Sequence, residues 1–127
     1  GRYSGSILEP KTIISGGPRG NRWPFIKYDE KITVDTRSLD SFCEEHGIGH
    51  IDFLWMDVQG AEKEVFLGAK NMIGKISYIY TEYHEEEMYE GATNLQTVSD
   101  LLPGYELAQN WPYTDVMGGD ALFKLRD

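Results

Sequence analysis

The sequence contains a single cysteine, Cys43, and no run of uninterrupted apolar residues long enough to cross a membrane. A membrane helix needs roughly 18 such residues, so we expect no membrane partner. One cysteine cannot form an internal disulfide, which indicates a reducing, cytoplasmic compartment. The first residues carry no basic-then-apolar leader. The chain begins with Gly1 rather than Met, and we expect a chain that was processed, tagged or cut from something longer.

Basic residues are also scarce, because 12 Lys and Arg stand against 21 Asp and Glu, for a formal net charge of −9. Proteins that bind nucleic acid usually show the reverse, a basic face that displaces counterions from phosphates. The basic residues are scattered here, apart from a small group at Arg19, Arg22 and Lys27. Nucleic acid is therefore not an expected partner.

Common catalytic and nucleotide-binding motifs are missing. The sequence has no P-loop, no G-x-S-x-G nucleophile elbow and no C-x-x-C metal pair. The segment SGGPRG, residues 15–20, is rich in glycine but lacks the preceding strand and following helix that a phosphate-binding loop requires. We interpret it as an ordinary loop.

The length of 127 residues is typical of one domain with one hydrophobic core. Residues 1–30 form an irregular leading segment with frequent Gly and Pro. Two short stretches, 11–14 and 31–34, have the composition of strands that could pair. The rest of the chain is more regular.

Hydrophobic periodicity and capping residues predict alternating helices and strands from residue 36 onward. A short amphipathic helix has Thr36 or Ser38 as its cap and Gly47 as its stop. A strand over Ile51–Met56 is apolar enough to be buried on both faces. Next come a helix over 61–72, a strand over 75–83 and a helix capped by Asn94 or Thr93. The chain ends with strands over 105–109 and 121–125, joined by a loop over 110–120. This order predicts an α/β fold with a mainly parallel sheet and one antiparallel strand in the final pair.

Titratable side chains follow two of the predicted parallel strands. Asp57 ends the first strand, and Glu82 and His84 end the second. Ligands of open α/β sheets sit beyond the carboxyl ends of the strands, so these three groups are expected to converge. Gly60 lets the chain turn sharply into the next helix, which brings Glu62 to the same edge.

Each of these residues also has a structural interpretation. Asp57 can be a turn-forming residue, and Glu62 can interact with the dipole of its helix, which is worth about 0.3–1 kcal/mol. His84 alone is more often structural than catalytic. Asp57, Glu82 and His84 together would also suit a metal site, as in a metal-dependent hydrolase, although no close ligand spacing such as H-x-x-x-H supports one.

The block VDTRSLDSFCEEHGIGHIDFLWMDVQGAEKEVFLGAK, residues 34–70, resembles the centre of the FkbM-type S-adenosylmethionine-dependent methyltransferases. The similarity is carried by Leu39-Asp40, by IDFL, by DVQGAE at residues 57–62 and by Gly68-Ala69. The segments SGSILEP near the start, TEY after the next strand, MYEGA at residues 88–92 and GDALF at residues 119–123 agree as well. The resemblance therefore extends over most of the chain.

This resemblance implies the C-terminal half of a class I methyltransferase, or Rossmann-like, fold. The last two strands of that fold form an antiparallel pair. The family's first strand and glycine-rich cofactor loop, and the strand that ends in an acidic residue for the ribose, have no counterpart in these 127 residues. Residues 1–127 are therefore expected to form a single but incomplete methyltransferase-like domain. Met56 stands where the family often has a basic residue before the motif's Asp.

The implied activity is transfer of a methyl group from S-adenosylmethionine to a hydroxyl of a sugar or other small metabolite. Asp57, Glu82 and His84 are then the candidate catalytic residues, and Asp57 and Gln59 the candidate cofactor contacts. Glu62, Tyr83 and Tyr89 are the candidate contacts to the acceptor, although the composition around the tyrosines also suits core and rim positions.

Two alternatives stay open at this point. The chain could be a non-catalytic methyltransferase-like fragment that binds a partner, or it could be a metal-dependent hydrolase. Without the missing first strand, one edge of the strand Ile51–Met56 would be unpaired, and exposed edges recruit other chains. We therefore expect self-association, as a homodimer, through this edge.

Overall fold

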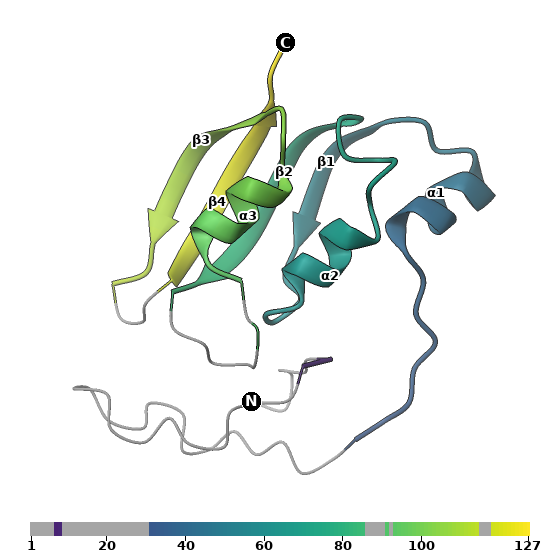
Figure 1. The fold of residues 1–127 in the computed structure, drawn as a ribbon, viewed down its shortest axis with the longest axis horizontal. Coiled ribbons are helices and arrows are strands. Elements are labelled where there is room, and N and C mark those ends of the chain that lie inside the picture. The colour runs from purple at the N-terminus through teal and green to yellow at the C-terminus, as the bar shows by residue number, and fades with distance from the viewer. Residues whose placement is uncertain (1–6, 9–30, 86–90, 92, 115–117) are drawn as a thin grey trace.

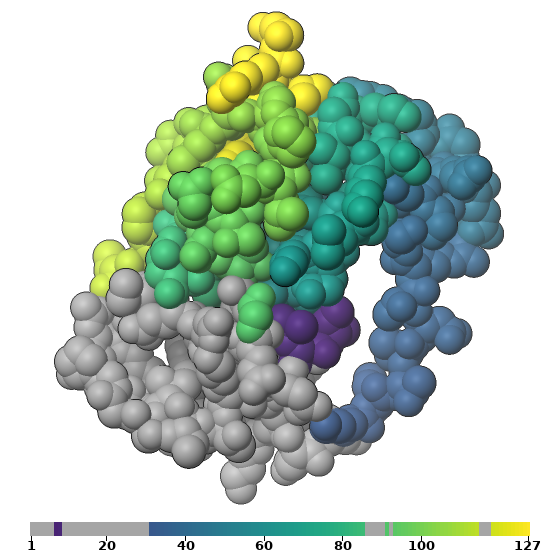
Figure 2. Space-filling view, in the orientation of Figure 1, coloured from purple at the N-terminus to yellow at the C-terminus, as the bar shows by residue number. Residues whose placement is uncertain are grey.

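The computed structural model describes residues 7–8, 31–85, 91, 93–114 and 118–127. The described elements run in the order α1, β1, α2, β2, α3, β3, β4. Residues 31–38 are exposed and leave the body of the molecule as an extended arm before α1 begins (Figure 2). The stretch 31–34, which has the composition of a strand, forms no strand in the described structure, and the stretch 11–14 lies outside the described residues.

Helix α1, Leu39–His46, begins and ends at the residues that the sequence indicated. The Ser38 hydroxyl accepts a hydrogen bond from the backbone N–H of Ser41, which satisfies one free donor of the first turn. Gly47 has a φ of 65° and closes the helix with hydrogen bonds to the carbonyls of Cys43 and Glu44. The free thiol of Cys43 is buried on the inner side of α1.

Helix α2, Glu62–Leu67, is shorter than the predicted helix over 61–72, and turns follow it as far as Gly74. The reason is a contact with α1. The two carboxylate oxygens of Asp40 accept the backbone N–H groups of Asn71 and Met72, at 2.9 and 3.0 Å. The N–H of Met72 also donates to the carbonyl of Ala69 at 3.0 Å, so the segment after Leu67 is held by a turn bond and by a side chain far away in sequence rather than by a further α-helical turn.

Helix α3, Leu95–Leu101, is capped by Asn94, whose side chain accepts from the N–H of Thr97 at 2.8 Å. Asn94 and Thr93 are the two predicted caps of this helix, and the structure confirms Asn94. None of the helices in the described part of the chain is long and apolar enough to cross a membrane. The cytoplasmic location stays a prediction.

The four strands are β1 (Ile51–Met56), β2 (Ile76–His84), β3 (Tyr105–Pro112) and β4 (Gly118–Leu125). They form one sheet in the order β1-β2-β4-β3. β1 and β2 are parallel, whereas β4 runs antiparallel to both β2 and β3. The antiparallel final pair is therefore confirmed. The prediction of a mainly parallel sheet is confirmed for the direction of the strands, since β1, β2 and β3 point the same way (Figure 1). It is wrong for their pairing. Two of the three strand pairs are antiparallel, because β4 inserts between β2 and β3.

The last two strands are longer than predicted. The expected loop over 110–120 is wrong at both ends, since residues 110–112 belong to β3 and residues 118–120 to β4. Gly118 and Gly119 make this possible. A Cβ on Gly119 would lie 2.6 Å from the carbonyl oxygen of Trp111 and 2.7 Å from the hydroxyl of Tyr83. Only a residue without a side chain lets the strands approach so closely.

Helices α2 and α3 cover one face of the sheet (Figure 1). The main core lies between these helices and the sheet. The fully buried side chains of this core include Phe66, Ile79, Val98 and Phe123. Helix α1 lies beside β1 and reaches the core through Cys43.

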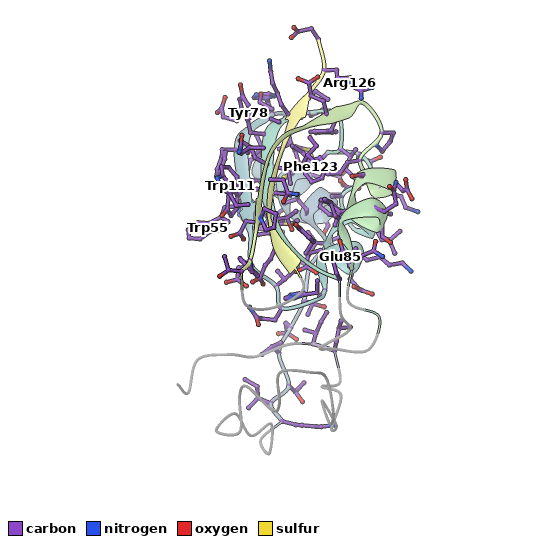
Figure 3. The ribbon with its side chains drawn as sticks, turned by 90° about the vertical axis from the view of Figure 1, so that its left-hand side faces the viewer. Trp55, Tyr78, Glu85, Trp111, Phe123 and Arg126 are labelled. Carbon is purple, nitrogen blue, oxygen red and sulfur yellow. The ribbon has the colours of Figure 1, made fainter. Side chains whose placement is uncertain are left out.

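The other face of the sheet carries aromatic side chains that point away from α3, among them Trp55, Tyr78 and Trp111 (Figure 3). Trp55 is 72% exposed and Phe53 is 54% exposed. The prediction that Ile51–Met56 is buried on both faces is therefore wrong in the described structure. β1 is an edge strand there, and no described helix covers its second face.

Candidate functional site

The segment after β1 turns sharply, as the sequence indicated. Gln59 and Gly60 both have positive φ, 51° and 98°, which is rare for a residue other than glycine. The Gln59 amide nitrogen donates to Oδ1 of Asp57 at 2.6 Å. Asp57 is exposed at the carboxyl end of β1. The turn thus presents a carboxylate that is already oriented by a neighbouring amide.

Glu62, the first residue of α2, is a buried carboxyl with 0% exposure. Its Oε1 accepts the backbone N–H of Gly60 at 3.2 Å, whereas Oε2 has no hydrogen-bond partner among the described residues. Burial raises the pKa of Glu62 above its ordinary value, and the bond from Gly60 opposes that rise only in part. Glu62 therefore holds the turn in place from inside the protein.

The side chains of Glu82 and His84 lie together at the carboxyl end of β2 and form an ion pair when His84 is protonated. His84 Nε2 lies 3.5 Å from Oε2 of Glu82, which is close enough for strong charge interaction but long for a hydrogen bond. The His84 imidazole lowers the pKa of Glu82, and Glu82 in turn raises the pKa of His84 against the opposing effect of burial. The side chain of His84 is only 6% exposed, so the pair is partly shielded from water.

The predicted convergence of these groups occurs in the structure. The carboxylates of Glu62 and Asp57 both act on His84 and raise its pKa further, so residues from three elements lie within electrostatic reach. The backbone N–H of His84 donates to the carbonyl of Thr93 at 3.0 Å, which ties the end of β2 to the segment before α3.

The two tyrosines predicted as acceptor contacts are not placed alike. Tyr83 is buried, and its hydroxyl donates to Oδ1 of Asn110 at 2.9 Å. Successive strand residues point to opposite faces, so Tyr83 points to the helix-covered side and Glu82 to the other. Tyr89 lies outside the described residues.

Two residues that the sequence analysis missed complete the cluster around Glu82. The hydroxyl of Tyr113 lies 2.8 Å from Oε1 of Glu82 and 3.0 Å from Oδ1 of Asp120. Asp120 is the direct cross-strand partner of Glu82 in the pairing of β2 with β4. Asp120 stands within the GDALF segment, but only the strand pairing shows which residue it faces.

The donor set does not favour a metal. No group of three or more His, Cys, Asp or Glu side chains in the described part of the chain is arranged to hold a metal ion. The metal-dependent hydrolase thus gains no support from these residues. What the arrangement offers is an imidazole beside a carboxylate, the usual pairing for accepting a proton from a hydroxyl.

Comparison with known proteins identifies the family to which the chain is related. Residues 3–111 match the model of the methyltransferase FkbM domain. The chain is also 44% identical over 109 residues to the 2-O-methyltransferase NoeI of Sinorhizobium fredii (strain NBRC 101917 / NGR234). That alignment covers 86% of this chain and 42% of the relative, so the chain spans less than half the length of that protein. No solved structure matches the chain.

The family match covers most of the sequence, including the turn at residues 57–62 and the ends of β1 and β2 where the titratable side chains gather. Both comparisons indicate the same group of proteins as the motif residues. The chain belongs to the FkbM methyltransferase family.

Proposed function

We propose that this chain carries part of the active site of an S-adenosylmethionine-dependent methyltransferase that acts on a hydroxyl of a sugar or other small metabolite. The observation that carries the proposal is the cluster of Asp57, Glu82 and His84 at one edge of the sheet, in a chain of the FkbM family. The relative's name, a 2-O-methyltransferase, is consistent with an oxygen acceptor.

The turn after β1 fits the cofactor in part. Asp57 is exposed and has its Oδ1 bonded to Gln59, so Oδ2 can accept a hydrogen bond from a ligand. A carboxylate beside an amide suits the hydroxyl and ammonium groups of S-adenosylmethionine. The glycine-rich loop that the family uses for the rest of the cofactor has no counterpart in this sequence. When bound, the cofactor supplies a methyl group activated by a sulfonium.

His84 is the proposed base. Methyl transfer to a hydroxyl forms a carbon–oxygen bond and releases the hydroxyl proton, which neutral His84 accepts on a ring nitrogen. Both ring nitrogens are buried, and neither has a hydrogen-bond partner among the described residues. Glu82 stabilises the imidazolium that forms, because its carboxylate lies 3.5 Å from Nε2.

The remaining polar groups hold this arrangement. Glu62 keeps the turn of Asp57 in place through the N–H of Gly60, and it contacts the acceptor only if its buried Oε2 is uncovered when the acceptor binds. Tyr89 remains a proposed acceptor contact. Tyr83 contributes from the opposite face, where its bond to Asn110 fixes the end of β3.

A chimera tests this function. In it, the chain replaces the matching region of the 2-O-methyltransferase relative, and release of S-adenosylhomocysteine is measured with the relative's own acceptor. We expect turnover above background that disappears in the same chimera with His84→Ala. A folded chimera that binds S-adenosylmethionine, measured by calorimetry, but shows no turnover would refute the proposed active site.

A further inference from the structure

Two carboxylates face each other across the strands at the edge of the site. Glu82 and Asp120 are direct partners in the antiparallel pairing of β2 with β4, and both are partly buried. Like charges at directly opposite positions destabilise a sheet. A buried or half-buried pair of this kind therefore needs a donor or a cation that offsets the repulsion.

The hydroxyl of Tyr113 lies between these carboxylates. Its distances are 2.8 Å to Oε1 of Glu82 and 3.0 Å to Oδ1 of Asp120. A phenol has one proton, so it donates to only one carboxylate at a time. Burial and the hydrogen bond to Glu82 raise the pKa of Tyr113 far above its ordinary value, so the phenol keeps that proton.

The backbone holds Tyr113 at this place. Tyr113 directly follows β3, and its N–H donates to the carbonyl of Gly118, the first residue of β4, at 2.9 Å. The phenol therefore reaches Glu82 from a fixed point between β3 and β4.

The second oxygen of Glu82 is the one that faces His84. Tyr113 occupies Oε1, and Oε2 lies 3.5 Å from Nε2 of the imidazole. A carboxylate held at one oxygen cannot rotate freely, so the other oxygen is directed at the ring. Among the described residues, Glu62 from α2 and Asp57 after β1 are the further charged groups that act on His84. Tyr80, on the same face of β2, also lies near Glu82 and Asp120.

We propose that Tyr113 is a positioning residue for the proposed base: by bonding Oε1 of Glu82, it keeps Oε2 directed at His84 while Asp120 stands opposite. The effect on catalysis rests on the proposed function. The effect on the titration of His84 does not, since it can be measured in the chain without cofactor or acceptor.

The first experiment is an NMR titration of the His84 ring in the 127-residue chain, with the signal assigned by its absence in His84→Ala. We expect Tyr113→Phe to lower the His84 midpoint by roughly 0.5–1 unit, because Glu82 loses its fixed orientation and the hydrogen bond that stabilises its charge. Asp120→Asn should leave the midpoint unchanged, since Tyr113 can still donate to Glu82. The matched control is Tyr78→Phe, which removes a hydroxyl from an exposed tyrosine on the same strand as Glu82.

Two outcomes would overturn the proposal. One is an unchanged or raised His84 midpoint in a folded Tyr113→Phe variant. The other is an equal fall of the His84 midpoint in Tyr113→Phe and Asp120→Asn. That result would mean that any change at this strand end shifts the midpoint, and that Tyr113 only connects β3 to β2 and β4.

The second experiment measures turnover in the chimera. Tyr113→Phe should lower kcat several-fold with little change in the KM for the acceptor, and should move the acidic limb of the pH profile in the same direction as the NMR midpoint. If the chimera has no turnover while the NMR midpoint shifts as expected, the proposed function fails and the positioning of Glu82 by Tyr113 stands. Turnover that is unaffected by Tyr113→Phe overturns the catalytic part of the inference.

Discussion

The carboxyl of Glu62 accepts the backbone N–H of Gly60 at 3.2 Å from a position with no solvent exposure. The glutamate that begins α2 thereby fixes the turn that carries Asp57, which lies three residues before Gly60 in the sequence. A carboxyl buried in this way is stabilised in its protonated form, and burial raises its pKa above the ordinary value.

The first prediction concerns the pH dependence of stability at Glu62. A carboxyl whose pKa is raised by folding contributes stability that is present below its unfolded pKa and is lost as the pH rises through its folded pKa. Glu62→Gln keeps an oxygen for Gly60 and removes the charge. We expect the free energy of unfolding of the variant, relative to the natural chain, to increase as the pH rises from 4 to 8.

Urea denaturation at several pH values measures this difference. Glu64→Gln, which lies in the same helix turn but is exposed, is the control and should show no such trend. A constant difference between Glu62→Gln and the natural chain at every pH would contradict the prediction.

The second prediction concerns the close contact of β3 and β4 at Gly119. Its Cβ would lie within 2.8 Å of Trp111, Tyr83 and Pro112 atoms, two of which are backbone. Gly119→Ala should therefore destabilise the chain by about 1–3 kcal/mol, the usual cost of overpacking. Gly49→Ala is the matched control, because nothing lies within 4 Å of its added Cβ. Equal unfolding free energies for the two variants would show that the strands can separate at low cost.

The third prediction concerns Asp57. In the chimera, Asp57→Asn should lower turnover at least about tenfold, which corresponds to about 1.4 kcal/mol, with little change in melting temperature because the side chain is exposed. Asp52→Asn, whose side chain is 99% exposed on the preceding strand β1, should retain full turnover. Full turnover in Asp57→Asn would reduce Asp57 to a turn residue.

The fourth prediction separates the ion pair from the cofactor contacts. Glu82→Gln and His84→Ala should lower kcat about 100-fold or more, the usual contribution of a general base, and should change cofactor affinity much less. Turnover of the chimera without these substitutions should rise with pH through the folded pKa of His84, because only neutral imidazole accepts a proton. Equal losses in kcat and cofactor affinity would place the pair in the cofactor site or in the fold.

The fifth prediction concerns self-association, which we propose for the open edge of β1. Among the described strands β1 pairs on one side only, and the neighbouring Trp55 and Phe53 are largely exposed. We expect dimers in sedimentation at micromolar concentration and monomers after Trp55→Lys, since a charge on an exposed edge strand discourages pairing. Phe42→Lys, on α1, is the control. A natural chain that sediments as a monomer and whose β1 amides resist hydrogen exchange would disprove the proposal.

Most of the helices and strands, and the two strand ends where the titratable groups gather, could be predicted from the sequence. Ser38, Gly47 and Asn94 carry local capping chemistry, so the limits of α1 and the start of α3 follow from neighbours in the chain. Asp57, Glu82 and His84 follow from the rule that parallel strands end at a common edge. The length of α2 did not follow, because the carboxylate that replaces its last turn belongs to Asp40.

The partners that lie opposite each residue could not be predicted, because they depend on how the elements pack together. The exposure of Trp55 depends on whether another layer covers the second face of the sheet, and the apolar composition of β1 carries no information about that. The bonds of Tyr113 to Glu82 and Asp120 depend on the insertion of β4 between β2 and β3. Local propensity acts over a few residues, whereas the pairing of β2 with β4 joins Glu82 to Asp120, 38 residues further along the chain (120 − 82). The surroundings of the proposed base therefore appear only in the folded chain.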